Sequence, residues 1–220
     1  GFQSGMAVLV SQYWGRGDVD NINRCMGVAL YAVTGFSTVL ALITFFFPSQ
    51  VLGLITPNQE LVALGARYIQ IVGFSYILNG VSSIYAGLHR STEYPKFGMA
   101  LYGISMCVNT FLNYVLIFGK FGAPAMGVTG AAAATLISRV VEFLAAGAFA
   151  LRSRRLPLRW RCILRPGKPI LHSFIRYSAP VVCNEAMWSV GTSMLTVIMG
   201  HMSNSQDMLA AYALIGNIDR

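Results

Sequence analysis

The chain has 220 residues, of which 55% are hydrophobic and only 11% are charged. A soluble domain normally carries about 25% charged residues, so this composition excludes an ordinary soluble domain. The net charge of +8 would suit a nucleic-acid-binding protein, but the basic residues are placed along the chain as in a membrane protein.

Five hydrophobic stretches with few or no charges are each long enough to cross a bilayer. A helix needs about 20 apolar residues to span the hydrocarbon core. The stretches are residues 25–47, 68–88, 97–119, 126–151 and 177–200. We therefore expect an all-α membrane protein that folds as a polytopic helical bundle.

The loops between these stretches alternate between basic and non-basic. Residues 15–24, 89–96 and 152–176 hold 12 of the 16 Lys and Arg. The intervening loops 48–60, 120–125 and 201–207 hold only Lys120. By the positive-inside rule the basic set is cytoplasmic, which predicts a multi-pass protein of the cell (plasma or inner) membrane.

The order of spans and loops predicts three parts. Residues 1–14 are typical of the end of a span, and residues 208–218 of the start of another, so we expect a fragment of a larger transporter-like protein. Residues 1–151 would form an amino-terminal lobe, residues 152–169 a basic cytoplasmic linker, and residues 170–220 the start of a second lobe. Repeat-built transporters have this organisation.

The linker carries seven Lys or Arg, three prolines and no acidic residue. One interpretation is a connection between bundles whose arginines attract anionic lipid, with Trp160 at the interface. The other is an ordinary basic loop that fixes the orientation of the chain. No motif supports nucleic-acid binding.

Polar residues recur within two of the predicted spans. Ser105, Asn109 and Asn113 are spaced by four and share one helix face. The two Asn carbonyls could serve a small hard cation or a polar substrate, but hydrogen bonding between helices explains them equally simply, and the residues alone favour that packing role.

A second polar stripe runs along the next span and contains Thr135, Ser138, Arg139 and Glu142. Arg139 and Glu142 are three residues apart, so a structural ion pair is the favoured interpretation and a proton relay the alternative. Thr135 alone is more typical of helix packing than of ion binding.

Glu185 lies inside a predicted span with no Lys or Arg within four residues, and Asn184 adjoins it. A carboxylate without a partner in the membrane indicates a functional site. Low dielectric favours its protonated form, so it could exchange a proton for a cation or a cationic solute. The alternative is an ion pair with a helix outside this chain.

Four stretches resemble the multidrug and toxic compound extrusion (MATE) family. They are SQYWGRGD (11–18), YAGLHRSTEYPKFGM (85–99), NTFLNYVLIFGKFGAPAMGVTGAAAATLISRVVEF (109–143) and PVVCNEAMWSVG (180–191). The resemblance implies twelve helices in two six-helix lobes, with Na⁺ or H⁺ driving the export of organic, often cationic, compounds. It implies that this chain runs from the second helix of the family into the eighth, so that the first helix of the first lobe is missing.

The resemblance also implies site residues. The cation-coupling residues would be Asn109, Asn113, Ala131 and Thr135, with Na⁺ held by the side chains of Asn109, Asn113 and Thr135. The family places the acidic residue that completes this site on its first helix. Glu185 is similar to a carboxylate on the seventh helix of the family.

The leading hypothesis is therefore a cation-coupled antiporter. Glu185 would bind substrate, proton or cation, and Glu142 and Arg139 are further candidates for that role. Its partners would be small organic substrates and the lipid bilayer, with no nucleic acid and no cofactor other than the coupling ion, and the complete protein would be a monomer.

Two alternatives stay open, a lipid-linked oligosaccharide flippase and a non-transporting membrane scaffold. A flippase would need several unpaired cations, whereas Glu142 can neutralise Arg139. An enzyme is not expected, because no catalytic motif lies within a span and His89, His172 and His201 all lie at span ends.

Overall fold

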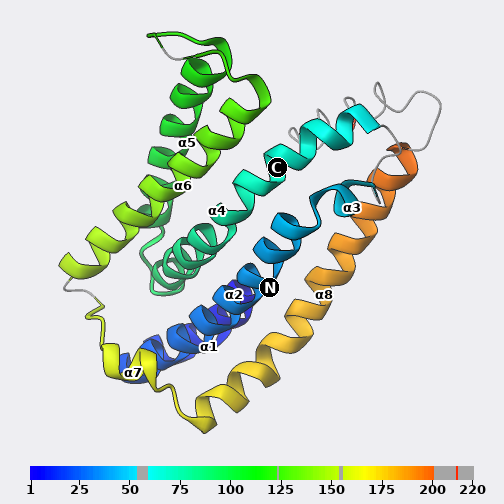
Figure 1. Cartoon of the computed structure of the whole chain (residues 1–220). Helices are drawn as coiled ribbons and strands as arrows, with labels where there is room; N and C mark the ends of the chain where they lie inside the picture. Colours follow the sequence, from blue (N-terminus) through cyan, green and yellow to red (C-terminus); the bar gives the residue numbers. More distant parts are fainter. Residues whose placement is uncertain (54–58, 123, 154–155, 201–211, 213–220) are drawn as a thin grey trace.

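The computed structural model describes residues 1–53, 59–122, 124–153, 156–200 and 212. The regular structure in these ranges is entirely helical (Figure 1). The helices are α1 (Phe2–Gly15), α2 (Val19–Phe46), α3 (Pro48–Gly53), α4 (Gln59–Ser91), α5 (Pro95–Phe118), α6 (Gly127–Arg152), α7 (Trp160–Leu164) and α8 (Lys168–Gly200). The expected start of a further span at residues 208–218 lies outside the described residues.

Five helices are long and apolar enough to cross a membrane, namely α2, α4, α5, α6 and α8. They coincide with the five stretches that the sequence predicts, so the chain is a multi-pass membrane protein. Three of the helices begin at least six residues before the predicted spans: α2 at Val19 instead of residue 25, α4 at Gln59 instead of residue 68, and α8 at Lys168 instead of residue 177. Pro180 therefore lies in the interior of α8. Such prolines are tolerated in membrane helices because neighbouring groups can satisfy the freed carbonyl.

Local sequence signals explain several helix ends. The carboxylate of Asp18 accepts a hydrogen bond of 3.0 Å from the backbone N–H of Asn21 and so caps α2. Pro95 opens α5, where its missing N–H costs least. Gly119 closes the same helix with φ of +66°, a left-handed conformation that glycine adopts without strain.

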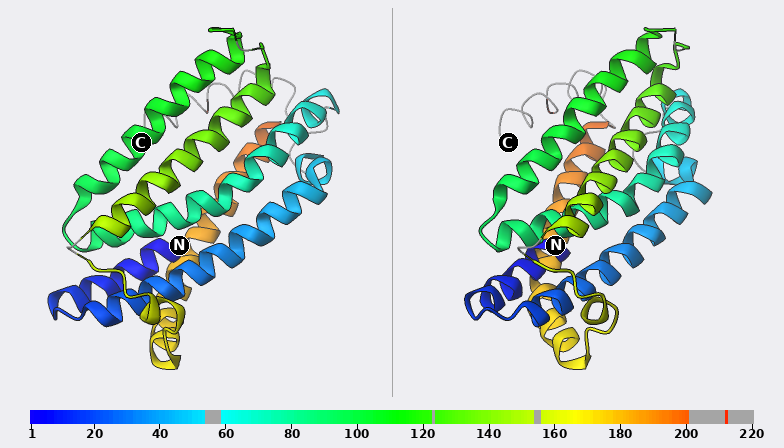
Figure 2. Two further views of the ribbon diagram at one scale, coloured as in Figure 1. Left: turned by 60° about the vertical axis from the view of Figure 1, so that its left-hand side comes forward. Right: turned by 90° about the vertical axis from the view of Figure 1, so that its left-hand side faces the viewer.

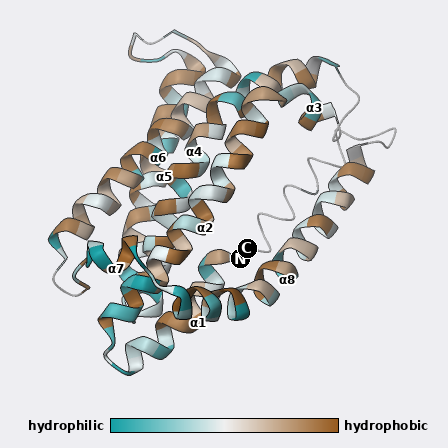
Figure 3. Ribbon diagram, turned by 60° about the horizontal axis from the view of Figure 1, so that its bottom comes forward, coloured by the Kyte–Doolittle hydropathy of each residue, from teal (hydrophilic) through white to brown (hydrophobic). Residues whose placement is uncertain are grey.

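The loops gather at the two ends of the bundle according to their charge. The α1–α2 turn, the α4–α5 turn and the linker with α7 lie at one end, and the α2–α4 and α5–α6 connections lie at the other (Figures 1 and 2). Hydrophobic residues follow the long helices, whereas hydrophilic residues are prominent around α7 (Figure 3). The three basic segments therefore share one end, as the alternation of charge predicts.

The helices α1, α2, α4 and α6 form the centre of the structure, with α5 packed against α4 and α6. The buried cluster includes Met6, Ile22, Cys25, Ile84 and Leu88. Small residues bring α6 close to α5, since a Cβ added at Gly130 would lie only 2.6 Å from the carbonyl oxygen of Leu116. The helix α8 packs only against α1 and α2 among the described elements.

Candidate functional site

A polar seam joins α5 and α6 inside the membrane-spanning part of the chain. The Nδ2 of Asn113 donates to Oδ1 of Asn109 at 2.9 Å, and Nδ2 of Asn109 donates to Oγ of Ser138 at 3.3 Å. Ser138 in turn donates to the carbonyl oxygen of Thr135 at 2.8 Å. The seam is a directed chain of hydrogen bonds from α5 into α6, and it unites both predicted polar stripes.

The shared face of Asn109 and Asn113 was predicted from their spacing, but their arrangement was not. Two carbonyl oxygens aimed at one point were expected, whereas the oxygen of Asn109 already accepts the amide of Asn113. The Oδ1 of Asn113 is buried and has no hydrogen-bond partner among the described residues. A buried amide oxygen without a donor is costly and is a suitable ligand for a hard cation.

The two α6 residues that the family resemblance adds lie one turn apart. The hydroxyl of Thr135 donates to the carbonyl oxygen of Ala131 at 3.0 Å. This bond satisfies the hydroxyl hydrogen and leaves the lone pairs of the Thr135 oxygen for another ligand. The carbonyl oxygen of Thr135 accepts the hydrogen bond from Ser138, so the hydroxyl and the carbonyl of Thr135 both take part in the hydrogen bonds of the seam.

Arg139 and Glu142 form the ion pair that their spacing predicts. Nη1 of Arg139 lies 2.5 Å from Oε2 of Glu142, and the carboxylate side chain is fully buried. The second oxygen, Oε1, has no partner among the described residues. The pair neutralises Arg139, the cation that a carrier of anions would need. It also leaves Oε1 of Glu142 buried and able to accept a hydrogen bond from a further donor.

Glu185 is not isolated, contrary to the expectation from sequence. Its Oε1 accepts a hydrogen bond of 2.8 Å from Oγ of Ser4 on α1. Its side chain is 47% exposed. Ser4 is thus a candidate functional residue that the sequence analysis missed, and its only signal was a hydroxyl within an apolar segment.

Glu185 opens onto a groove of about 450 Å³ between α1, α2, α4 and α8. Its other walls are mostly apolar and include Phe2, Val33, Phe36, Ile84 and Val182. A carboxylate beside aromatic and aliphatic walls is suited to an organic cation, because the charge and the hydrocarbon of such a ligand are both matched.

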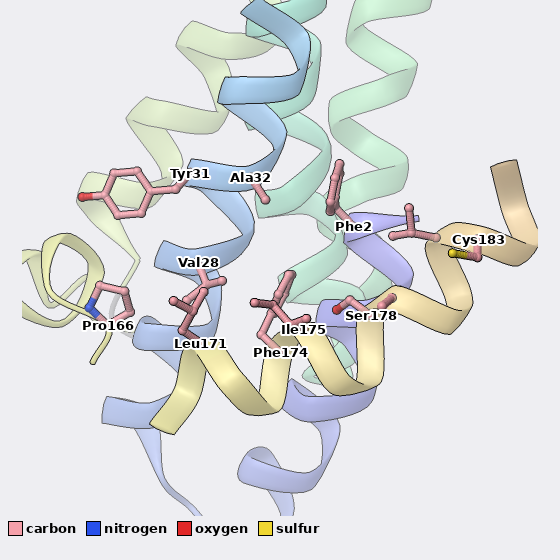
Figure 4. A pocket seen from close by; sticks show the side chains of 12 residues that line it. Phe2, Val28, Tyr31, Ala32, Pro166, Leu171, Phe174, Ile175, Ser178 and Cys183 are labelled. Carbon is pink, nitrogen blue, oxygen red and sulfur yellow. The ribbon is translucent and has the colours of Figure 1, made fainter. Parts of the chain in front are cut away.

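A larger apolar cavity of about 710 Å³ separates α8 from α2. In Figure 4, side chains from α2 and α8 line it together with Phe2 of α1 and Pro166 of the linker. Its walls carry no charged residue.

The structure does not bring the two candidate sites together. The Asn109–Asn113 seam lies on α5, which packs against α4 and α6, whereas Glu185 lies on α8, which packs against α1 and α2. No α5–α8 packing is present among the described residues. Binding at one site can therefore reach the other only through the helices between them.

Comparison with known proteins gives the family. The family model MatE matches residues 1–115. A probable multidrug resistance protein, YoeA of Bacillus subtilis (strain 168), is 26% identical over 222 residues, which cover 99% of this chain and 47% of the relative. The chain thus spans about half the length of such relatives.

Two solved structures have the same fold. An outward-facing MATE family transporter of the MOP superfamily superposes with a TM-score of 0.82 at 17% identity, over 99% of this chain and 48% of that one. An inward-facing member superposes with a TM-score of 0.70 at 18% identity, over 90% and 42% of the two chains.

Proposed function

The chain belongs to the MatE family, and from that premise we propose that it forms the amino-terminal part of a secondary antiporter. The transporter would export organic, often cationic, compounds in exchange for Na⁺ or H⁺ across the cell membrane, with the linker on the cytoplasmic side. The complete protein would work as a monomer with two lobes, and residues 1–151 would supply most of the first lobe.

The observation that carries this proposal is the ordered polar seam between α5 and α6. A seam used only for packing would satisfy all its members, yet Oδ1 of Asn113 is buried and has no donor among the described residues. The names of the relatives, probable multidrug resistance proteins, favour the same function.

Ion coupling falls to Asn109, Asn113, Ala131 and Thr135. A cation would take the free oxygen of Asn113 first. The cation would then bind Oδ1 of Asn109 after the amide of Asn113 breaks its hydrogen bond to that oxygen. Ion binding would therefore be linked to a rearrangement of α5 against α6. Such a change of partners gives the ion differential affinity for two states, which coupling requires.

Substrate binding falls to Glu185 in its groove, with Glu142 and Arg139 as a second ionisable pair near the seam. Release of Ser4 from Glu185 would free the carboxylate for a cationic ligand. The flippase alternative is less well supported, because Arg139 is already paired with Glu142.

Transport in vesicles tests the proposal. The complete protein is reconstituted with an imposed Na⁺ or pH gradient, and efflux of a fluorescent organic cation is followed. We expect gradient-driven efflux from the unaltered protein. In an Asn109→Ala, Asn113→Ala double variant the efflux rate should fall about tenfold or more, because removal of the ion ligands uncouples transport from the gradient. Asn79→Ala, another membrane-embedded Asn on α4, is the matched control and should keep the rate.

Unchanged coupling in the double variant would exclude the seam as the ion site. Failure of the unaltered protein to move any organic cation under either gradient would exclude the antiporter itself.

A further inference from the structure

The segment that follows α6 is packed onto the start of α2. Leu156 and Ile163 are buried members of the same hydrophobic cluster as Cys25 and Met26 of α2. The short helix α7 lies beside the first turns of α2 in Figures 1 and 2, and the two elements are in contact. We call residues 156–164 the strap.

Side chains of α2 bind both edges of the strap. Asn23 donates to the carbonyl oxygen of Pro157 and accepts from the backbone N–H of Arg159, each at 3.2 Å. The guanidinium of Arg159 lies 2.5 Å from Asp20. Further along, the hydroxyl of Tyr31 donates to the carbonyl oxygen of Leu164 at 3.3 Å. These contacts extend over most of the strap.

The backbone of the strap also touches the backbone of α2. A Cβ added at Gly27 would lie 2.2 Å from the carbonyl oxygen of Ile163, which is closer than real Cβ atoms approach an oxygen. Only glycine allows this approach, so the close docking of α7 requires glycine at position 27 in addition to the polar contacts.

The anchoring contacts end where α8 is about to begin. Arg165 and Gly167 are exposed, and Gly167 has φ of +83°. Beyond them, Ile170 and Phe174 of α8 join the buried cluster, while an apolar cavity of about 710 Å³ lies between α8 and α2. A segment held by polar contacts is therefore followed directly by a short exposed one, after which α8 packs against α1 and the core.

We propose that the strap is a fixed part of the first bundle and that the chain bends at Arg165–Gly167 when α8 moves. This inference rests on the proposed function, since alternating access requires α8 to change its position against α1 and α2. Hinges are a few loop or terminal residues that absorb changes in φ and ψ. The strap confines that change to three residues, so the long basic connection acts as a short joint.

A pair of disulfide cross-links in the complete protein tests this division. In the first variant, Asp20→Cys is combined with native Cys162, whose Sγ lies 3.5 Å from Oδ1 of Asp20, and every other cysteine is replaced by serine. In the second, Cys162→Ser accompanies Gly1→Cys and Val182→Cys. A Cβ at position 1 would lie 3.4 Å from Cβ of Val182, close to the separation that a disulfide needs.

Efflux of the organic cation is measured for each variant when reduced and when oxidised. We expect oxidation of the first variant to change the rate by less than about twofold, because the strap does not leave α2. Oxidation of the second should lower the rate about tenfold or more, with recovery on reduction, because it ties α8 to α1.

The outcomes separate the two proposals. Loss of efflux on oxidation of the first variant, or its survival in the oxidised second variant, would overturn the hinge and leave the antiporter standing. No efflux from the unaltered protein would overturn both.

A second measurement does not depend on transport. Gly27→Ala should displace the strap and slow formation of the 20–162 disulfide about tenfold, because the added methyl overlaps the carbonyl of Ile163. Gly35→Ala on the same helix has nothing within 4 Å of the added atom and should leave the rate unchanged. Equal rates in the two variants would contradict close docking of the strap.

Discussion

The contact between α5 and α6 differs in kind from the contact of α8 with α1 and α2. In the first, small residues bring backbones together, and a hydrogen-bonded chain crosses from Asn113 to Thr135. In the second, α8 meets α1 closely at Gly5, where an added Cβ would lie 2.7 Å from Cα of Ser178, but an apolar cavity of about 710 Å³ lies between α8 and α2. Ser4 of α1 provides a polar tie to Glu185.

This difference indicates which parts of the chain keep their arrangement and which can change it. Within a membrane, apolar surfaces gain little by meeting each other instead of lipid, so close packing and hydrogen bonds hold helices together. The α5–α6 pair has both, whereas α8 packs closely against α1 at Gly5 but is separated from α2 by an apolar cavity. Four sets of substitutions test this contrast. In each, the change in the free energy of unfolding is measured by chemical denaturation in mixed micelles.

The largest effect is expected at the buried ion pair of α6. Arg139→Gln leaves the fully buried carboxylate of Glu142 without its cation, which should lower the free energy of unfolding by about 3 to 5 kcal/mol. The Arg139→Gln, Glu142→Gln double variant removes both charges and should recover most of that loss. Equal losses in the single and double variants would mean that the pair is not what stabilises this region.

Matched leucines compare the central core with the side of α8 that faces the cavity. Leu88 of α4 is 2% exposed, whereas Leu171 of α8 is 44% exposed and lines the large cavity. Leu88→Ala should cost about 2 to 3 kcal/mol through lost packing, and Leu171→Ala less than about 1 kcal/mol, because its site is already open. Similar costs at both positions would contradict the open packing of α8 against α2.

Two glycines of α6 test how closely it approaches α5. Gly130→Ala introduces a Cβ 2.6 Å from the carbonyl oxygen of Leu116, whereas Gly147→Ala meets nothing within 4 Å. The first should destabilise the protein by about 1 to 2 kcal/mol through overpacking. The second should be neutral or slightly stabilising, because alanine favours the helix. The reverse order would show that the small-residue contact is not close.

The smallest effects concern two buried serines. Ser138 accepts from Asn109 and donates to Thr135, so Ser138→Ala should cost about 1 kcal/mol. The hydroxyl of Ser178 on α8 is buried without a hydrogen-bond partner among the described residues, so Ser178→Ala should be neutral or stabilising by up to about 1 kcal/mol. A clear destabilisation by Ser178→Ala would reveal a polar contact of α8 and weaken the contrast.

Much of the fold could be predicted because the bilayer imposes strict rules on sequence. The five spans follow from the length of uncharged stretches, and the grouping of loops at each end of the bundle follows from their charge. The start of α8 was placed too late, because the charges of Lys168 and Arg176 interrupt the hydrophobic stretch. Its continuation to Lys168 depends on packing against α1 and α2.

The candidate site was predictable in its residues and not in its bonds. Spacing alone placed Asn109 and Asn113 on one face and paired Arg139 with Glu142. It could not indicate that one Asn amide occupies the oxygen of the other, because both orientations have the same spacing. Nor could it identify Ser4 as a partner of Glu185, since the two residues are far apart in the chain.

The sequence by itself determined that the chain crosses the membrane repeatedly, which loops share a side, and which polar residues share a helix face. These properties depend on hydrophobic length, charge and helical period, which are local. Only the tertiary structure decided that α5 and α6 are bound together by a polar seam, that the strap is held on α2, and that an apolar cavity lies between α8 and α2. Those outcomes depend on contacts between segments that are distant in the sequence, and the energies of such contacts cannot be predicted from any one short segment.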